Sequence, residues 1–209
     1  MTAHITSLTS ARVSFILMVT FLAVGRVRMY PNGAPEESCS DMIPLHHADE
    51  DNSNTPLLQP QTTTPYYTVL VSTTDVEPNG HVTVTISADQ SHDYEGFFLQ
   101  ARRANDTSGT RYGTFTADSS NNVTTRCSSQ GITHSNNVER YNTSVVWMAP
   151  STKVYNIQFK ATVVNNYSIF FTNIHSQVLN PSTGSSAVVV PSLGLSLFVL
   201  LLRLINHVH

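Results

Sequence analysis

Polar and apolar residues alternate along two long stretches of the chain, as they do in strands that bury one face and expose the other. The stretch HVTVTISA (residues 81–88) places valine and isoleucine on one side and threonine on the other. The stretch VYNIQFKATVV (residues 154–164) repeats this pattern, with asparagine, glutamine, lysine and threonine in the polar phase. Both stretches therefore predict half-buried β-strands.

Shorter apolar or β-branched runs lie between and around these two strands. They are YYTVLVS (66–72), GFFLQARR (96–103), TSVVWMAP (143–150) and YSIFFTN (167–173), separated by turn-forming clusters such as EPNG and DSSNN. No segment outside the two termini has a convincing helical period. The pattern predicts an all-β fold, an immunoglobulin-like antiparallel β-sandwich of about seven to nine strands.

The inward phase of each predicted strand defines the expected core. A large aromatic residue on a sandwich strand belongs there, because it removes more apolar area from water than any other side chain. The predicted core consists of Val82, Val84, Ile86, Phe97, Leu99, Trp147, Tyr155, Ile157, Phe159 and Ala161.

The first residues have the pattern of a secretory signal peptide, which we assign to residues 1–25. A weakly basic start precedes the apolar run FILMVTFLAV, and small residues follow at Ala23 and Gly25. A short buried helix or an uncleaved anchor is the alternative. We then expect an extended N-terminal arm over residues 26–65, rich in proline and acidic residues, and a sandwich body over residues 66–175.

The end of the chain is similar to a lipid-attachment signal. A linker with small residues (176–187) precedes an apolar tail (188–209), as in chains whose tail is replaced by glycosylphosphatidylinositol. A retained transmembrane helix is the rival, because the apolar run reaches about 18 residues, the lower limit for a span. A soluble product is the third possibility. The expected lipid-attachment residue is one of Ser182, Gly184, Ser185 and Ser186.

Charge narrows the range of partners. Without the signal peptide and the tail, fourteen acidic residues face nine basic ones, so a general nucleic-acid binder is not expected. The charge is also uneven, since residues 26–95 contain eleven acids and two arginines, whereas residues 96–186 contain three acids and seven basic residues. Any contact with an anionic partner is therefore expected in the second half of the chain.

The two cysteines, Cys39 and Cys127, fall in the part expected to be extracellular, where thiols oxidise. A single disulfide is the simplest pairing, with two free buried thiols as the alternative, and we expect Trp147 to fill the core beside the disulfide. We predict a secreted or cell-surface protein that has passed through the secretory pathway. Four N-glycosylation sequons fit the same compartment, at Asn105, Asn122, Asn142 and Asn166.

The sequence lacks the motifs of several common enzyme classes. It contains no Gly-x-Ser-x-Gly, no HExxH and no phosphate-binding glycine loop. His46 and His47 precede three acidic residues and so have the composition of a metal site, but a solvated loop explains this stretch more simply. His134 is expected to pack against the core. We expect no catalytic residue, no metal and no cofactor.

Several short segments follow one another along residues 33–167 in a recognisable order and spacing. They are GAPEESCSDMIPLH, PQTTTPYYTVLVS, VTVTIS, GFFLQAR, GTF, Cys127, THS, WMAP and FKATVV. This series resembles the reeler (reelin) domain family, and within it the insect defence proteins and the small reelin-domain proteins.

The resemblance implies that residues 96–103 form a central strand. Phe97 and Leu99 would then pack into the sandwich, with the alternate residues on the other face. Arg102 and Arg103 would sit at the exit of this strand, within reach of water, of Asp106 or of a polyanionic ligand.

The resemblance also implies a function, a recognition module in innate defence that binds microbial surface polymers or sulfated glycans. A cell-adhesion protein that binds matrix glycans is the alternative, and an enzyme or an accessory of a ferric-chelate reductase is the third interpretation. Guanidinium groups suit sulfate and phosphate oxygens through paired hydrogen bonds. The candidate ligand-binding residues are Arg102, Arg103, Arg111 and Arg126.

Overall fold

The computed structural model describes residues 30–181. The predicted signal peptide, the lipid-attachment residues and the apolar tail lie outside the described residues. Within residues 30–181, no helix is long and apolar enough to cross a bilayer. The secondary structure consists of η1 (Glu36–Cys39), β1 (Tyr67–Val71), β2 (Asp75–Val76), β3 (His81–Ala88), β4 (Gly96–Arg103), β5 (Thr114–Phe115), η2 (Ser119–Asn121), β6 (Val123–Arg126), β7 (Gly131–His134), β8 (Asn142–Met148), β9 (Ile157–Asn166) and β10 (Ile169–Pro181).

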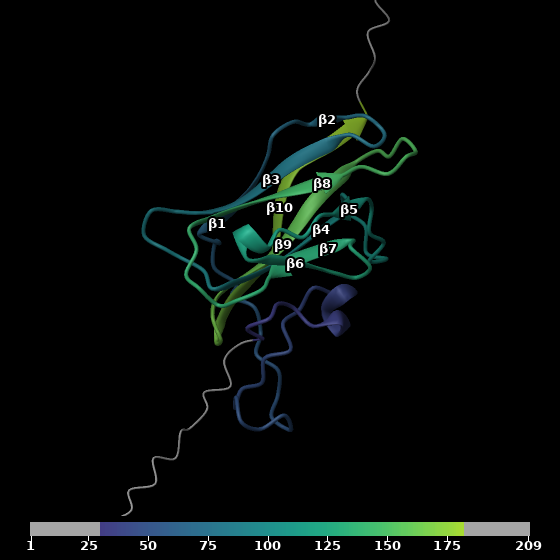
Figure 1. Ribbon diagram of the computed structural model, residues 1–209. Helices are drawn as coiled ribbons and strands as arrows, with labels where there is room; N and C mark the ends of the chain where they lie inside the picture. Colours follow the sequence, from purple (N-terminus) through teal and green to yellow (C-terminus); the bar gives the residue numbers. More distant parts are fainter. Residues whose placement is uncertain (1–29, 182–209) are drawn as a thin grey trace, which may run out of the picture.

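The strands form two sheets that pack face to face. One sheet has four strands in the order β1-β3-β8-β5, and the other has six in the order β2-β10-β9-β4-β7-β6. All pairs are antiparallel except β2 with β10, which is parallel. Figure 1 shows β3 and β8 in the upper layer and β4, β6 and β7 in the lower one. The prediction of an all-β sandwich is confirmed.

The core lies between the two sheets and follows the predicted phase with one exception. Trp147 is fully buried, and its ring meets that of Phe159 edge-on, with 5.3 Å between centroids. Tyr155 was expected in this core, but 56% of its surface is exposed. The alternation fails there because Asn156 adopts the left-handed region (φ 56°) and β9 begins only at Ile157.

Strand β4 is buried on both faces. Its residues Phe97 and Leu99 pack into the sandwich, while Phe98 and Gln100 lie on the outer face and are also buried. The predicted central strand is therefore found, with β7 on one side and β9 on the other. A second cover is needed on the outer face of the six-stranded sheet, and the N-terminal arm supplies it.

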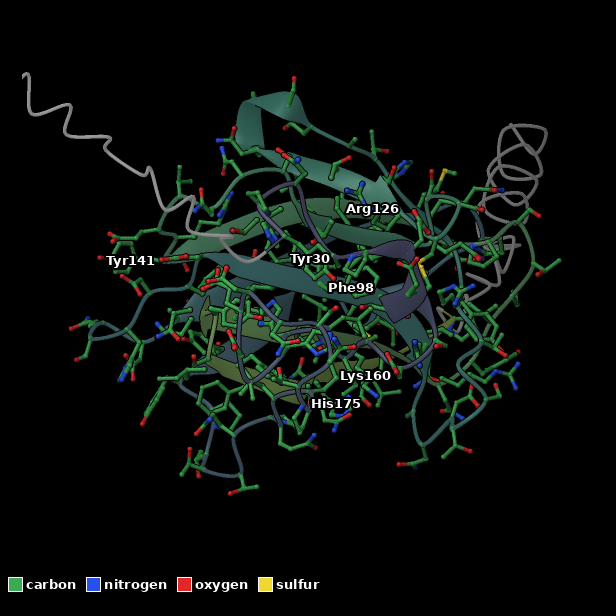
Figure 2. The ribbon with its side chains drawn as sticks, turned by 90° about the horizontal axis from the view of Figure 1, so that it is seen from below. Tyr30, Phe98, Arg126, Tyr141, Lys160 and His175 are labelled. Atoms are coloured by element: carbon green, nitrogen blue, oxygen red, sulfur yellow. A yellow bond between two sulfur atoms is a disulfide. The ribbon has the colours of Figure 1, made fainter. Side chains whose placement is uncertain are left out.

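The N-terminal arm (residues 30–65) lies across this outer face rather than extending away from it. Thr162 on β9 donates a hydrogen bond of 2.7 Å to the carbonyl of Met42, and Nδ1 of His46 lies 2.7 Å from the carbonyl of Tyr167. In Figure 2 the arm crosses in front of the sheet close to Phe98. The arm is therefore part of the folded domain.

The predicted disulfide between Cys39 and Cys127 is present, with 5.8 Å between the Cα atoms. It fixes the arm beside Met42 and Phe98 on the outer face, so the expectation that it would neighbour Trp147 is wrong. Gly131 is required next to it, because a Cβ there would lie 2.8 Å from the Phe98 ring.

The end of the sandwich body differs from the predicted boundary. Strand β10 continues to Pro181, so the first part of the segment assigned to a linker belongs to the six-stranded sheet. Its last two residues pair with β2.

Candidate functional site

Arg102 holds the N-terminal arm. Its Nη2 donates hydrogen bonds to the carbonyls of Cys39 (3.1 Å) and Ser40 (2.8 Å), and its Nε donates to Oε1 of Gln100 (2.9 Å). Only 5% of its surface is exposed. The expectation that Arg102 extends into water at the strand end is therefore wrong, because the arm covers most of this side chain.

Arg111 and Arg126 are also directed at the arm. Nη1 of Arg111 donates to the carbonyl of Cys39 (2.8 Å), and Nε of Arg126 donates to the carbonyl of Ala34 (2.9 Å). Because the acceptors on the arm are uncharged oxygens, these hydrogen bonds do not neutralise the guanidinium charges. The structure thus assigns a structural contact to three of the four candidate arginines.

Arg103 is the candidate arginine that is exposed as predicted. Its guanidinium carbon lies 5.4 Å from the centre of the Tyr112 ring, which is the distance of a cation–π contact. Because Arg103 is exposed, its guanidinium can also donate hydrogen bonds to a ligand.

A groove of about 620 Å³ lies beside Arg103 on the outer face of the six-stranded sheet. Its basic side chains come from β4, β9 and β10, and Lys160 on β9 pairs in register with His175 on β10. Figure 2 places Lys160 and His175 next to each other. We call this feature the basic groove, and its charged and rim residues are Arg102, Arg103, Asn105, Asp106, Lys160 and His175.

The electrostatics of the basic groove favour an anion. Burial lowers the pKa of Lys160, and repulsion from Arg102 lowers it further. Burial also lowers the pKa of His175, and repulsion from the Lys160 ammonium lowers it further. Asp106 stands at the rim, where hydrogen bonds from Ser108 hold its pKa below the usual value. An anion placed between the basic side chains would offset their mutual repulsion.

Lys160 and His175 were not among the residues predicted for ligand binding. The alternation in residues 154–164 places Lys160 on the polar face, which is the signal that could have identified it. His175 had no comparable signal, since its position depends on β10, whose pairing with β9 shifts register on both sides of it.

Two of the three histidines singled out in the sequence, His46 and His134, are buried anchors of the arm, whereas His47 is half-buried and lies 2.7 Å from the carbonyl of Thr55. Nε2 of His134 lies 3.1 Å from the carbonyl of Tyr30, and its Nδ1 lies 3.1 Å from the backbone nitrogen of Phe97. The neutral tautomer with hydrogen on Nε2 satisfies both contacts. Burial lowers the pKa of His134 to about 4. His46 is 2% exposed and is held by its contact with the carbonyl of Tyr167, so it is not part of a solvated loop. The three acidic residues that follow, Asp49, Glu50 and Asp51, are exposed as expected.

Potential metal ligands and cavities add little to the site. Among residues 30–181, the one group of metal-ligating types is Glu36 with Cys39 and Cys127, whose sulfurs are bonded to each other. A cavity of about 30 Å³ between the arm and the sheet is apolar, and it has room for about two water molecules. The basic groove is therefore the feature of the described residues best suited to a ligand.

The four sequon asparagines are all exposed, so each is accessible in the folded domain. Glycosylation itself stays a prediction. Asn105 lies at the rim of the basic groove, Asn122 and Asn142 line a different groove beside β8, and Asn166 is the last residue of β9.

Relatives of two kinds are similar to this chain. Ferric-chelate reductase 1 of Homo sapiens is 32% identical over 183 residues, which is 83% of this chain but 28% of the reductase. A protein of Samia ricini that carries the name defense protein Hdd11-like is 30% identical over 153 residues, 70% of this chain and 84% of its own length. The chain thus spans less than a third of the reductases it matches and most of the defence proteins.

The fold has a counterpart among solved structures. The human F-spondin reeler domain superposes with a TM-score of 0.52 and 21% identity, over 59% of this chain and 94% of that domain. The family model described as Reeler domain matches residues 37–187, which include the cysteines, both sheets and the basic groove. The protein belongs to the Reeler domain family.

Proposed function

We propose that the protein is a non-catalytic recognition module on the extracellular side of the membrane, and that it acts in innate defence. Its similarity to the Samia ricini defence protein, which extends over most of both chains, supports the defence role. The ferric-chelate reductases match over less than a third of their own length, so their similarity gives no reason to assign a reductase activity to this chain.

The basic groove is the proposed binding surface, and its ligand is an anionic polymer of a microbial surface. The observation that carries this proposal is the register pair Lys160 and His175, which lies beside Arg102 and Arg103 on one face. Lys160 and the exposed Arg103 supply the positive charge, because the guanidinium of Arg102 is already bound to the arm and burial lowers the pKa of His175. Sulfate and phosphate groups have the charge and geometry for such donors.

A host sulfated glycan offers the same chemistry, so the experiment needs two ligands. Purified protein is applied to immobilised lipopolysaccharide and to heparin, and the salt concentration needed for elution is measured. We expect elution from lipopolysaccharide to require more salt, and both interactions to weaken as salt rises, because exposed charges are screened. Stronger retention on heparin would favour the adhesion interpretation.

Two variants with the same change of net charge test the groove. Lys160→Glu reverses a charge inside the basic groove, whereas Lys153→Glu reverses an exposed charge that does not line it. We expect Lys160→Glu to lower the salt needed for elution and Lys153→Glu to change it little. Equal shifts in the two variants would mean that retention follows net charge alone, and the basic groove would then not be the binding surface.

The attachment to the membrane is a separate proposal that rests on the sequence. We propose that the apolar tail is exchanged for a glycosylphosphatidylinositol anchor at one of the small residues between Ser182 and Ser186. Phosphatidylinositol-specific phospholipase should then release the protein from cells. A protein that stays on the cell and retains its NHVH terminus would instead have a transmembrane helix.

A further inference from the structure

The four-stranded sheet has an open edge along β8. Strand β3 pairs with β8 along its whole length, from Asn142 to Met148. On the other side, β5 pairs only with Trp147 and Met148. Within residues 30–181, the first five residues of β8 therefore have no partner strand on that side.

Two hydrogen bonds establish which backbone groups face the open edge. The carbonyl of Tyr141 accepts from the backbone N–H of Ala88, the last residue of β3, whereas the carbonyl of Val146 accepts from the backbone N–H of Thr116 on the opposite side (3.4 Å). Alternate residues of an antiparallel strand direct their N–H and C=O groups to the same side. Asn142 and Ser144, in phase with Val146, therefore direct their backbone groups to the open edge.

The open edge has the properties of a template for another strand. Charged residues and prolines usually protect an edge strand from pairing. The segment Asn142–Met148 contains neither. The side chains of Val146 and Met148 are 43% and 39% exposed. Two grooves of about 410 Å³ each run between β8 and the segment around η2, and Ser144 lines both. Unprotected edges of this kind associate with each other in many β proteins.

Two sequons lie at this edge. Asn142 is the first residue of β8, and Asn122 follows η2 in the left-handed region. Both are exposed, and both line the same groove, from opposite walls. A glycan is bulky and hydrophilic, so it would occupy the space that a pairing strand needs.

We propose that N-glycans on Asn122 and Asn142 cover the open edge of β8 and prevent it from pairing with the β8 edge of a second copy of the chain. The other two sequons lie elsewhere, at the rim of the basic groove and at the end of β9. The proposal does not depend on what the basic groove binds.

The experiment compares pairs of substitutions in protein secreted from a eukaryotic host. Asn122→Gln with Asn142→Gln removes both glycans at the edge, and Asn105→Gln with Asn166→Gln removes the other two. Molar mass is measured by light scattering during size-exclusion chromatography over a range of protein concentrations. We expect the first pair to reach at least twice the mass of one chain as concentration rises, and the second pair to stay at the mass of one chain.

A third pair separates loss of glycan from the role of the edge itself. Asn122→Gln with Ser144→Lys also removes both sequons, since NTS becomes NTK, but it places a charge on the open edge. We expect this pair to stay at the mass of one chain. Trimming the glycans of the folded wild-type protein with an endoglycosidase, which leaves one uncharged sugar on each asparagine, should reproduce the association, which excludes misfolding of the variants as its cause.

Three results would overturn the proposal. Peptide mass mapping could find Asn122 or Asn142 without a glycan in the secreted protein. The variant without edge glycans could stay at the mass of one chain at every concentration. The Ser144→Lys pair could associate to the same extent as the pair that keeps Ser144.

Discussion

Nη2 of Arg102 donates a hydrogen bond of 2.8 Å to the backbone carbonyl of Ser40, and so connects the end of β4 to the N-terminal arm. The same guanidinium also reaches Cys39 and Gln100. A lysine ammonium lacks this planar fork of donors. We therefore expect Arg102→Lys to lower the free energy of unfolding by about 2 to 3 kcal/mol in a urea titration.

Arg103→Lys is the matched control for this substitution. Arg103 is the next residue, is exposed and makes only the ring contact with Tyr112. The same change there should alter the free energy of unfolding by less than about 0.5 kcal/mol. Similar losses in the two variants would contradict the role of Arg102 as an anchor of the arm.

Removing the disulfide should cost more than removing any single hydrogen bond of the arm. The bridge closes a loop between residues 88 positions apart. On the chain-entropy model, a loop of this length constrains the unfolded state by about 4.6 kcal/mol. We expect Cys39→Ala with Cys127→Ala to lose a comparable free energy of unfolding. A loss below about 1 kcal/mol would be inconsistent with this account.

Adjacent residues on β9 should differ in their importance for stability. Phe159 is fully buried against Trp147, whereas Lys160 faces the basic groove. Phe159→Ala should lower the free energy of unfolding by about 3 to 5 kcal/mol, and Lys160→Ala by less than about 1 kcal/mol. Both values come from urea unfolding, and equal losses would mean that the two faces of β9 are wrongly assigned.

The protein should lose stability as the pH falls from about 6.5 to about 4. Burial lowers the pKa of His134 to about 4 in the folded protein, against about 6.5 for an unperturbed histidine, so in this range the unfolded chain binds more protons. The stabilisation that depends on the neutral imidazole of His134 is fully present above about pH 6.5 and is lost as the pH falls towards about 4. The loss is on the order of 3 kcal/mol at most.

Thermal unfolding at a series of pH values measures this loss. His134→Gln removes the titrating ring, so the variant should show a flatter dependence on pH in this window than the wild-type protein does. Burial also lowers the pKa of His46, which contributes a slope of the same sign and should remain in the variant. A variant with the wild-type slope would show that His134 is not responsible.

Strands with one buried and one solvent-exposed face were predictable from the alternation of apolar and polar residues alone. Strand β3 alternates buried and exposed residues in both sequence and structure, because one side meets the core and the other meets water. The cover on β4 was not predictable in this way. It depends on contacts such as that of Thr162 with Met42, 120 residues apart, which no local pattern encodes.

The binding surface was predictable only in part, for a similar reason. Arg102 and Arg103 were identified by their adjacency at a strand end, but the sequence could not separate an arginine that reaches water from one that binds backbone carbonyls. Lys160 and His175 meet through the register of β9 and β10, which includes bulges on both sides of His175. Register and bulges are set by packing over the whole sheet.

The contacts of the N-terminal arm have a consequence for the order of events during synthesis. The arm leaves the ribosome before the strands of both sheets, yet Met42 and His46 find their partners on residues 120 and 121 positions later in the chain. The thiol of Cys39 likewise cannot form its disulfide before Cys127 has been made. The arm is therefore made before the sheets but reaches its final place after them, and until β9 is complete it remains open to chaperones, oxidants and proteases in the compartment where the chain folds.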